Sequence, residues 1–110
     1  MQSAYRLKKN ASFSYVYKKG SSLSSPILVL SFVPARSNKV GVSISKKVGK
    51  SVTRSLIKRR IYENFATYMP ALKGNHNYVV IAKEGIVNAS FIEIGESIKQ
   101  LLHKAGHLDV

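Results

Sequence analysis

A run of basic residues in the middle of the chain is spaced to bind phosphate groups. Arg54 and Lys58 lie four residues apart, the spacing of neighbours on one face of an α-helix. Lys50 and Arg54 fall near the expected start of that helix, where the helix dipole disfavours cations. Free backbone amides and cations at a helix start form a phosphate site. The pattern therefore favours binding of a polyanion over a merely solvated basic face.

Two aromatic residues near the amino terminus are spaced to stack on nucleic-acid bases. Phe13 and Tyr17 lie one helical turn apart, and single-stranded RNA is typically bound by a basic groove with aromatic faces. Ser43, on an expected neighbouring strand, leaves room for a nucleic-acid backbone to approach. The alternative interpretation of both rings is core packing against a sheet.

The residue types disfavour cleavage of RNA by the protein itself. A protein ribonuclease needs a general acid and base, or carboxylates that hold a metal, and the first 62 residues contain neither acid nor histidine. His76 is expected to be solvated. His103 and His107 have a spacing that could bind zinc, but Gly106 lies between them and no HExxH motif is present. We therefore expect no catalytic residue and no metal ligand.

The positive charge is concentrated in the first half of the chain. The 110 residues carry a formal net charge of +13, and all five acids lie after position 62. Such a stretch indicates a polyanionic partner that screens its self-repulsion. Nucleic acid, an anionic membrane and an acidic protein all qualify. Nucleic acid is favoured, because the basic stretch has the pattern of a folded segment rather than of a tail.

Length and composition predict one compact domain over residues 1–110. The content of 45% hydrophobic and 21% charged residues is typical of a globular protein. No apolar run is long enough for a transmembrane helix, and no secretory signal is visible. The lack of cysteine removes disulfides, thiolate metal sites and cysteine nucleophiles. A cytoplasmic location fits these features.

Hydrophobic periodicity predicts the elements that position these residues. Helices are expected over 11–19, from 51 to about 69, and from 90 to about 104. Strands are expected over 27–33, 40–45 and 78–82, and 21–25 is expected to be a loop. This order indicates an α+β protein, an α/β sandwich with helices packed on a small sheet.

Local signals predict the helix ends and the buried faces. The expected N-caps are Asn10, then Ser51 or Thr53, then Ser90, which would form a capping box with Glu93. Gly20 and Pro70 are expected to end the first two helices. The expected buried side chains of the second helix are Ile57, Ile61, Phe65 and Tyr68, and those of the third are Phe91, Ile94, Ile98, Leu101 and Leu102.

Three passages resemble the protein component of bacterial ribonuclease P. They are residues 6–20, residues 40–49 (VGVSISKKVG) and residues 54–63 (RSLIKRRIYE), the last in place of the family's Arg-Asn-Arg-type motif. With the strand 78–82 and the last helix, the resemblance spans nearly the whole chain. The sequence departs from the family pattern at Ser55, Leu56 and Tyr62. The last two changes remove cations that are common in the family.

The resemblance implies a fold and a function. The family fold has the order αβββαβα, with a left-handed crossover around the basic helix. A catalytic RNA cleaves precursor tRNA at the mature 5′ end with magnesium ions, which the RNA mainly binds. The protein subunit of this endoribonuclease binds that RNA and the single-stranded 5′ leader of the substrate, and no obligate protein partner is expected. The alternatives are a ribosomal or other structural RNA-binding protein, and an autonomous nuclease.

The resemblance and the residue chemistry together predict three sets of contacts. The residues expected to bind the catalytic RNA are Lys46, Lys47, Lys50, Arg54, Ser55, Lys58 and Arg59. Those expected to bind the leader are Phe13, Tyr17, Ser43 and Lys83. A basic arm of Arg6, Lys8 and Lys9 is expected to follow the bound RNA.

Overall fold

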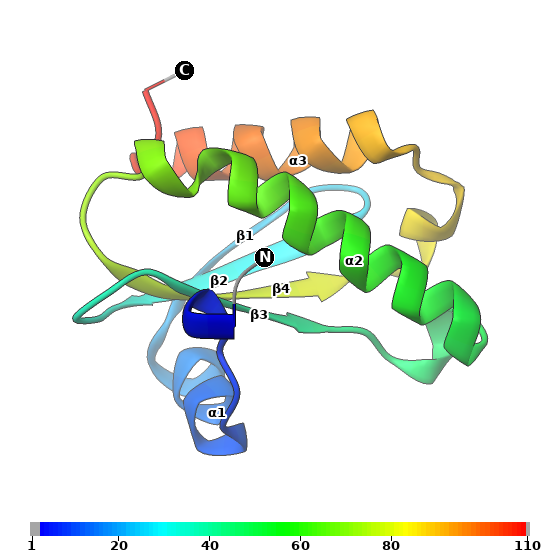
Figure 1. Cartoon of the computed structure of the whole chain (residues 1–110), viewed down its shortest axis with the longest axis horizontal. Helices are drawn as coiled ribbons and strands as arrows, with labels where there is room; N and C mark the ends of the chain where they lie inside the picture. Colours follow the sequence, from blue (N-terminus) through cyan, green and yellow to red (C-terminus); the bar gives the residue numbers. More distant parts are fainter. Residues whose placement is uncertain (1–2, 110) are drawn as a thin grey trace.

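A four-stranded sheet separates one helix from two others in the computed structural model, which describes residues 3–109 (Figure 1). The main elements are α1 (Asn10–Lys19), β1 (Ser21–Ser24), β2 (Leu28–Pro34), β3 (Lys39–Ser43), α2 (Ser51–Tyr68), β4 (His76–Ala82) and α3 (Phe91–Lys104). Short 3-10 turns lie at Ser3–Tyr5, Lys46–Val48, Met69–Ala71 and Glu84–Asn88. The αβββαβα order and the α+β class are confirmed.

The sheet has the strand order β1-β2-β4-β3. β2 pairs antiparallel with β1 and with β4, whereas β3 pairs parallel with β4. A parallel pair needs a crossover, and α2 provides it on the sheet face that also carries α3. The path from β3 through α2 to β4 has the left-handed sense that the resemblance implies (Figure 1). This topology leaves β3 at the edge of the sheet, beside α2.

The prediction of a loop over 21–25 was wrong, because Ser21–Ser24 forms the edge strand β1. Ser21 pairs with Phe32 and Ser24 with Val29, and the side chains of Ser22 and Ser31 share a hydrogen bond of 2.7 Å. The backbone ladder of an edge strand can form without apolar side chains. A serine-rich run therefore lacks the hydrophobic signal from which a strand is predicted.

Two layers of apolar side chains hold the helices on the sheet. The larger core lies under α2 and α3 and includes Ile61, Phe65 and Tyr78, all fully buried. The smaller core lies under α1 and includes Val16 and Val79. Neighbouring β4 residues thus point to opposite faces, as the twofold period of a strand requires.

α1 begins one residue before its predicted range, α2 begins at Ser51, and neither helix has a side-chain cap. Lys9 is the N-cap of α1 and Lys50 that of α2, so the predictions of Asn10, Ser51 and Thr53 as caps were wrong. In both cases the backbone of the lysine is extended and the next residue is already helical. The first backbone amides of both helices therefore lack a side-chain acceptor.

The capping box of α3 is confirmed, with Glu93 N donating to Ser90 Oγ at 3.1 Å.

Phe91 was predicted to be buried but is 42% exposed, because it is the first residue of α3 and lies at the rim of the helix pair. Tyr68 of α2 is only partly buried. The other predicted core residues of α2 and α3 are buried: Ile57, Ile61, Phe65, Ile94, Ile98, Leu101 and Leu102. Pro70 lies in the 3-10 turn that continues α2.

Candidate RNA-binding groove

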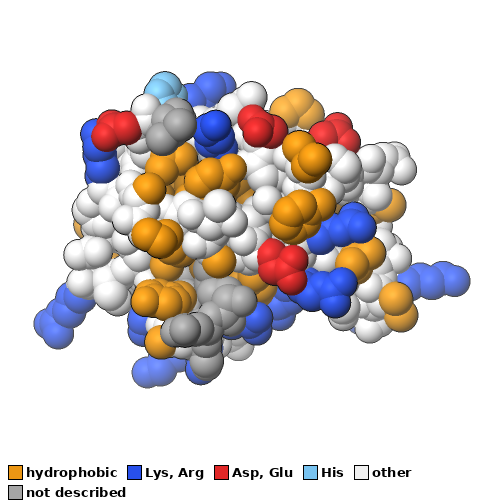
Figure 2. Space-filling view, turned by 45° about the horizontal axis from the view of Figure 1, so that its top comes forward, with side chains coloured by type: hydrophobic (Ala, Val, Ile, Leu, Met, Phe, Trp, Pro, Cys, Tyr) orange, Lys and Arg blue, Asp and Glu red, His pale blue; other side chains and the backbone are white. Residues whose placement is uncertain are grey.

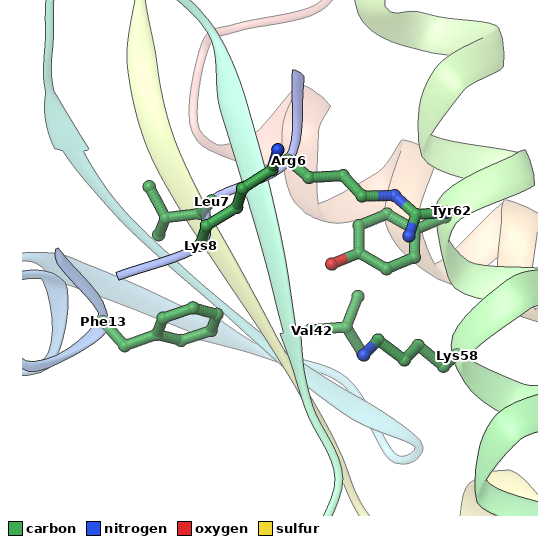
Figure 3. A pocket seen from close by; sticks show the side chains of 7 residues that line it. All are labelled: Arg6, Leu7, Lys8, Phe13, Val42, Lys58 and Tyr62. Carbon is green, nitrogen blue, oxygen red and sulfur yellow. The ribbon is translucent and has the colours of Figure 1, made fainter. Parts of the chain in front are cut away.

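A cleft of about 540 Å³ opens along β3 between α2 and the segment that precedes α1 (Figure 3). Its lining combines cations with apolar and aromatic side chains. The lining residues are Arg6, Leu7, Lys8, Phe13, Val42, Lys58 and Tyr62. The cleft therefore brings together residues from all three passages that carry the family resemblance.

The segment before α1 is fixed along the first half of the β3 edge. Leu7 N donates to Val40 O at 2.9 Å, and Arg6 forms an isolated parallel bridge with Val40. The Leu7 side chain is buried in the core under α1. This part of the predicted basic arm is thus a wall of the cleft.

The position of Phe13 fits both of the interpretations that the sequence left open. Its ring packs against the core under α1 and also lines the cleft. Tyr17 is 47% exposed and lies outside the cleft lining. Ser43, two residues after Gly41 on β3, is partly exposed on the α1 side of the strand. The structure therefore places only one of the two predicted stacking rings in the cleft.

A smaller pocket of about 240 Å³ continues the cleft along α2. It shares Val42 and Lys58 with the cleft, and its remaining lining residues are Ile44, Ser51, Arg54 and Ser55. Arg54 is held there because its Nε donates to Gly49 O at 3.2 Å. The predicted contacts Arg54, Ser55 and Lys58 thus meet in one place. We refer to the cleft and this pocket together as the groove.

Four other predicted basic contacts lie outside the lining of the groove. Lys46, Lys47, Lys50 and Arg59 are exposed. Lys46 and Lys47 lie in the 3-10 turn before α2, Lys50 is the N-cap of α2, and Arg59 lies on α2. Lys9 instead lines a separate hollow with Arg6, Lys8 and Lys39.

Lys83 points away from the groove. Its ammonium donates to Ser24 Oγ at 3.0 Å and to Ser25 O at 2.6 Å, at the turn between β1 and β2. This turn lies at the opposite edge of the sheet from β3. The side chain ties β4 to that turn.

The groove is positively charged and lacks a carboxylate in its lining. In a view with α2 and α3 turned forward, Lys and Arg side chains project along the lower and right-hand rim of the molecule and also at its top, where most of the visible Asp and Glu side chains lie (Figure 2). Clustered positive charge attracts polyanions and speeds their association.

Burial raises the pKa of the Tyr62 hydroxyl, an effect that Arg6 and a backbone hydrogen bond to Val42 oppose. Tyr62 is therefore a neutral ring at neutral pH.

The prediction that His76 is solvated was wrong, because its ring stacks on the buried ring of His107. His103 is exposed on α3, whereas His107 is buried beyond the end of that helix. The His107 and His76 rings stack with centroids 3.9 Å apart, and His107 Nδ1 shares a hydrogen bond of 2.8 Å with the Tyr78 hydroxyl. Residues 3–109 contain no group of three His, Cys, Asp or Glu side chains that could hold a metal ion.

A mixed sheet with helices on both faces, together with a basic groove that has an aromatic wall, defines a small RNA-binding protein. The family model described as Ribonuclease P matches residues 1–106. The chain belongs to the ribonuclease P protein family.

Individual relatives and solved structures agree with this assignment. A ribonuclease P protein component of Clostridium kluyveri is 47% identical over 106 residues, which cover 93% of this chain and 95% of that protein. One from Staphylococcus carnosus is 36% identical and covers 96% and 93%. A structure of the Staphylococcus aureus RNase P protein has a TM-score of 0.87 at 32% identity and covers 96% and 98%. In the described range, no helix is both long and apolar enough to span a membrane.

Proposed function

We propose that this chain, a ribonuclease P protein component that acts in tRNA 5′ processing, binds two RNAs through neighbouring parts of the groove. The pocket along α2, with Arg54, Ser55 and Lys58, contacts the catalytic RNA. The cleft, with Phe13 as its aromatic wall, takes the single-stranded 5′ leader of precursor tRNA. The observation that carries this proposal is the meeting of cations and a half-buried aromatic ring in a groove without a lining carboxylate.

Further contacts follow from the position of each predicted residue. The exposed cations around the groove, which are Lys46, Lys47, Lys50 and Arg59, extend the surface for the catalytic RNA. Ser43 is the small residue that allows close approach of the leader backbone, and Tyr17 adds a second stacking face where the leader continues along α1. Lys83 is left out of this proposal, because its ammonium is already hydrogen-bonded at the far edge of the sheet.

The side chains of this chain contribute binding and orientation rather than bond cleavage. Cations in the groove neutralise phosphates and release counterions, which makes the affinity strongly salt-dependent. A leader held in the cleft fixes the cleavage site relative to the catalytic RNA, and such positioning lowers the barrier of a later step. Neither role needs a titrating group in the groove.

Magnesium fits the catalytic RNA better than the described part of this chain, which offers no cluster of ligands for it. When bound, magnesium supplies charge stabilisation and an activated water for phosphodiester hydrolysis. We propose that residues 1–110 act as one domain in the cytoplasm. On this proposal the partners are the catalytic RNA and precursor tRNA, with no obligate protein partner and no membrane.

Reconstitution with the catalytic RNA tests the proposal. The chain should stimulate cleavage of precursor tRNA at moderate magnesium, and it should raise affinity for substrates with a long leader more than for mature tRNA. The protein without RNA should cleave nothing. Absence of stimulation with both components folded would reject the proposal in favour of a structural RNA-binding protein. Cleavage by highly purified protein would indicate an autonomous nuclease.

A further inference from the structure

The guanidinium of Arg6 lies over the ring of Tyr62, with its central carbon 4.4 Å from the ring centroid (Figure 3). A guanidinium in this position is attracted by the electron-rich face of the ring. Arg6 is exposed, whereas Tyr62 is buried with 4% of its surface accessible. The contact therefore joins a fixed ring on α2 to a surface cation from the opposite wall of the cleft.

Both partners of this contact are fixed by other parts of the fold. The Tyr62 ring belongs to the core under α2 and is almost fully buried there. The backbone of Arg6 is bridged to Val40, next to the buried side chain of Leu7. A free arginine side chain loses considerable rotamer entropy when it binds a ligand. Stacking on a fixed ring lowers that loss, because the guanidinium is already placed.

The stacked guanidinium keeps its donors for a ligand. The contact joins the central carbon of the guanidinium to the ring face and uses no N–H hydrogen bond, so the forked donors of the group remain available to a phosphate. Lys58 lies one helical turn before Tyr62 and lines the same cleft as Arg6. Figure 3 shows the Arg6 side chain reaching across to Tyr62, with the Lys58 ammonium beside Val42. The Arg6 guanidinium and the Lys58 ammonium thus both lie on the α2 side of the cleft, although Arg6 comes from the opposite wall.

We propose that Tyr62 is a positioning residue, which holds Arg6 so that Arg6 and Lys58 together bind a backbone phosphate of single-stranded RNA in the cleft. This inference rests on the proposed function, since the phosphate is that of the 5′ leader. Arg6 makes the contact with the phosphate, and Tyr62 acts only through Arg6. The ring of Tyr62 is the feature required, and its hydroxyl is not.

The inference is tested with Tyr62→Leu, Tyr62→Phe and Arg6→Gln in the complex with the catalytic RNA. Tyr62→Leu should lower affinity for precursor tRNA with a long leader by about two- to fivefold, the usual range for an exposed cation–π contact. Arg6→Gln should lower this affinity at least as much. The double variant that combines Tyr62→Leu with Arg6→Gln should bind no more weakly than Arg6→Gln alone. Tyr62→Phe should bind as the wild type does. Affinity for mature tRNA should stay unchanged in all four proteins.

Two further measurements separate positioning from a structural role. The NMR shift of Arg6 Nε–H should lose its ring-current contribution in Tyr62→Leu and keep it in Tyr62→Phe. Arg6→Lys leaves the core untouched and keeps the charge, but it replaces the planar group with a point charge. We expect this variant to lose most of the affinity that Arg6→Gln loses. Its effect can be read even where Tyr62→Leu does not fold.

Each outcome decides between the two claims. Additive losses in the double variant, or wild-type binding by Tyr62→Leu or by Arg6→Lys, would overturn the positioning role and leave the proposed function standing. A wild-type protein without any preference for a long leader would instead reject the proposed function itself. Lys104→Gln, at the exposed end of α3, is the matched control for loss of one charge and should change none of these affinities.

Discussion

The ring of Phe13 lies so close to Gly41 that a Cβ built at Gly41 would come within 2.3 Å of the ring atom Cζ. Because Gly41 has no side chain, the Phe13 ring can lie directly against β3, where it forms the aromatic wall of the cleft. The same ring packs against the core under α1, so its position is set by the sheet and not by α1 alone.

Gly41→Ala should displace the ring of Phe13 from β3. The two nearest atoms that meet the new methyl group belong to the Phe13 ring, which borders the open cleft and can swing aside, and the third is Leu7 Cβ at 3.2 Å, which must shift by a few tenths of an ångström. We expect a loss of stability of about 1 kcal/mol, at the low end for overpacking, and a clear loss of affinity for long-leader substrates. Urea unfolding and substrate titration measure the two effects. Gly85→Ala, where the new Cβ has only an ordinary contact, is the control. Unchanged leader affinity in Gly41→Ala would show that the ring position is irrelevant to binding.

Phe13→Leu should keep the fold and weaken leader binding. Leucine retains apolar contact with the core but removes the face on which a base stacks, and each stacked base contributes about 1–3 kcal/mol. Parallel titrations with precursor and mature tRNA measure the difference. Tyr17→Leu should lower affinity only for leaders long enough to continue along α1, since Tyr17 lies outside the cleft lining. If affinity for mature tRNA fell equally, the assignment of these rings to the leader would be wrong.

Replacing Arg54 and Lys58 with glutamine should weaken binding to the catalytic RNA and flatten its salt dependence. Each lost phosphate contact lowers the slope of log affinity against log salt by about 0.7–0.9. Titrations over a range of salt concentrations measure the slope. Lys104→Gln should leave it unchanged. A double variant with the wild-type slope would mean that these two cations face only solvent in the complex.

The stacked pair of His76 and His107 should make stability fall in mild acid. Burial lowers the pKa of both rings, and for His107 the charge of His76 lowers it further. With folded pKa values below the unfolded value of 6.5, the stabilisation is complete above pH 6.5 and is lost as the pH falls below it, because the unfolded chain takes up protons first. Urea unfolding at several pH values measures this loss.

Substitution of the pair provides the control for this pH dependence. His76→Phe keeps an aromatic ring on His107 and removes the buried Nδ1 that has no hydrogen-bond partner. In this variant the free energy of unfolding at neutral pH should stay equal or rise, and its decrease in mild acid should be smaller. His103→Gln changes an exposed ring and should not alter the profile. If the free energy of unfolding of His76→Phe decreased equally in mild acid, the groups responsible would lie elsewhere in the chain.

Most of the elements and the basic character of the groove are predictable from the sequence alone. Helical and strand periodicities are local properties of a chain, so α2, α3, β2 and β4 followed from the spacing of their apolar residues. The acid-free first half is visible in the residue types alone, and with the aromatic spacing it indicated an RNA partner. β1 was not predicted, because a serine-rich edge strand lacks the alternation of apolar and polar residues from which a strand is predicted.

The contacts that shape the groove depend on the path of the chain in space. Arg6 meets Tyr62, and Phe13 meets Gly41, because the parallel pairing of β3 with β4 leaves β3 at an edge that the amino-terminal segment can join. Nothing near Lys83 in the chain shows that its ammonium is bound at the β1–β2 turn. Residue spacing encodes which face of an element a side chain occupies, whereas strand order and packing decide which distant face lies opposite. The basic, aromatic chemistry of this protein is therefore readable from its residues, and the arrangement of that chemistry around one groove is a property of the fold.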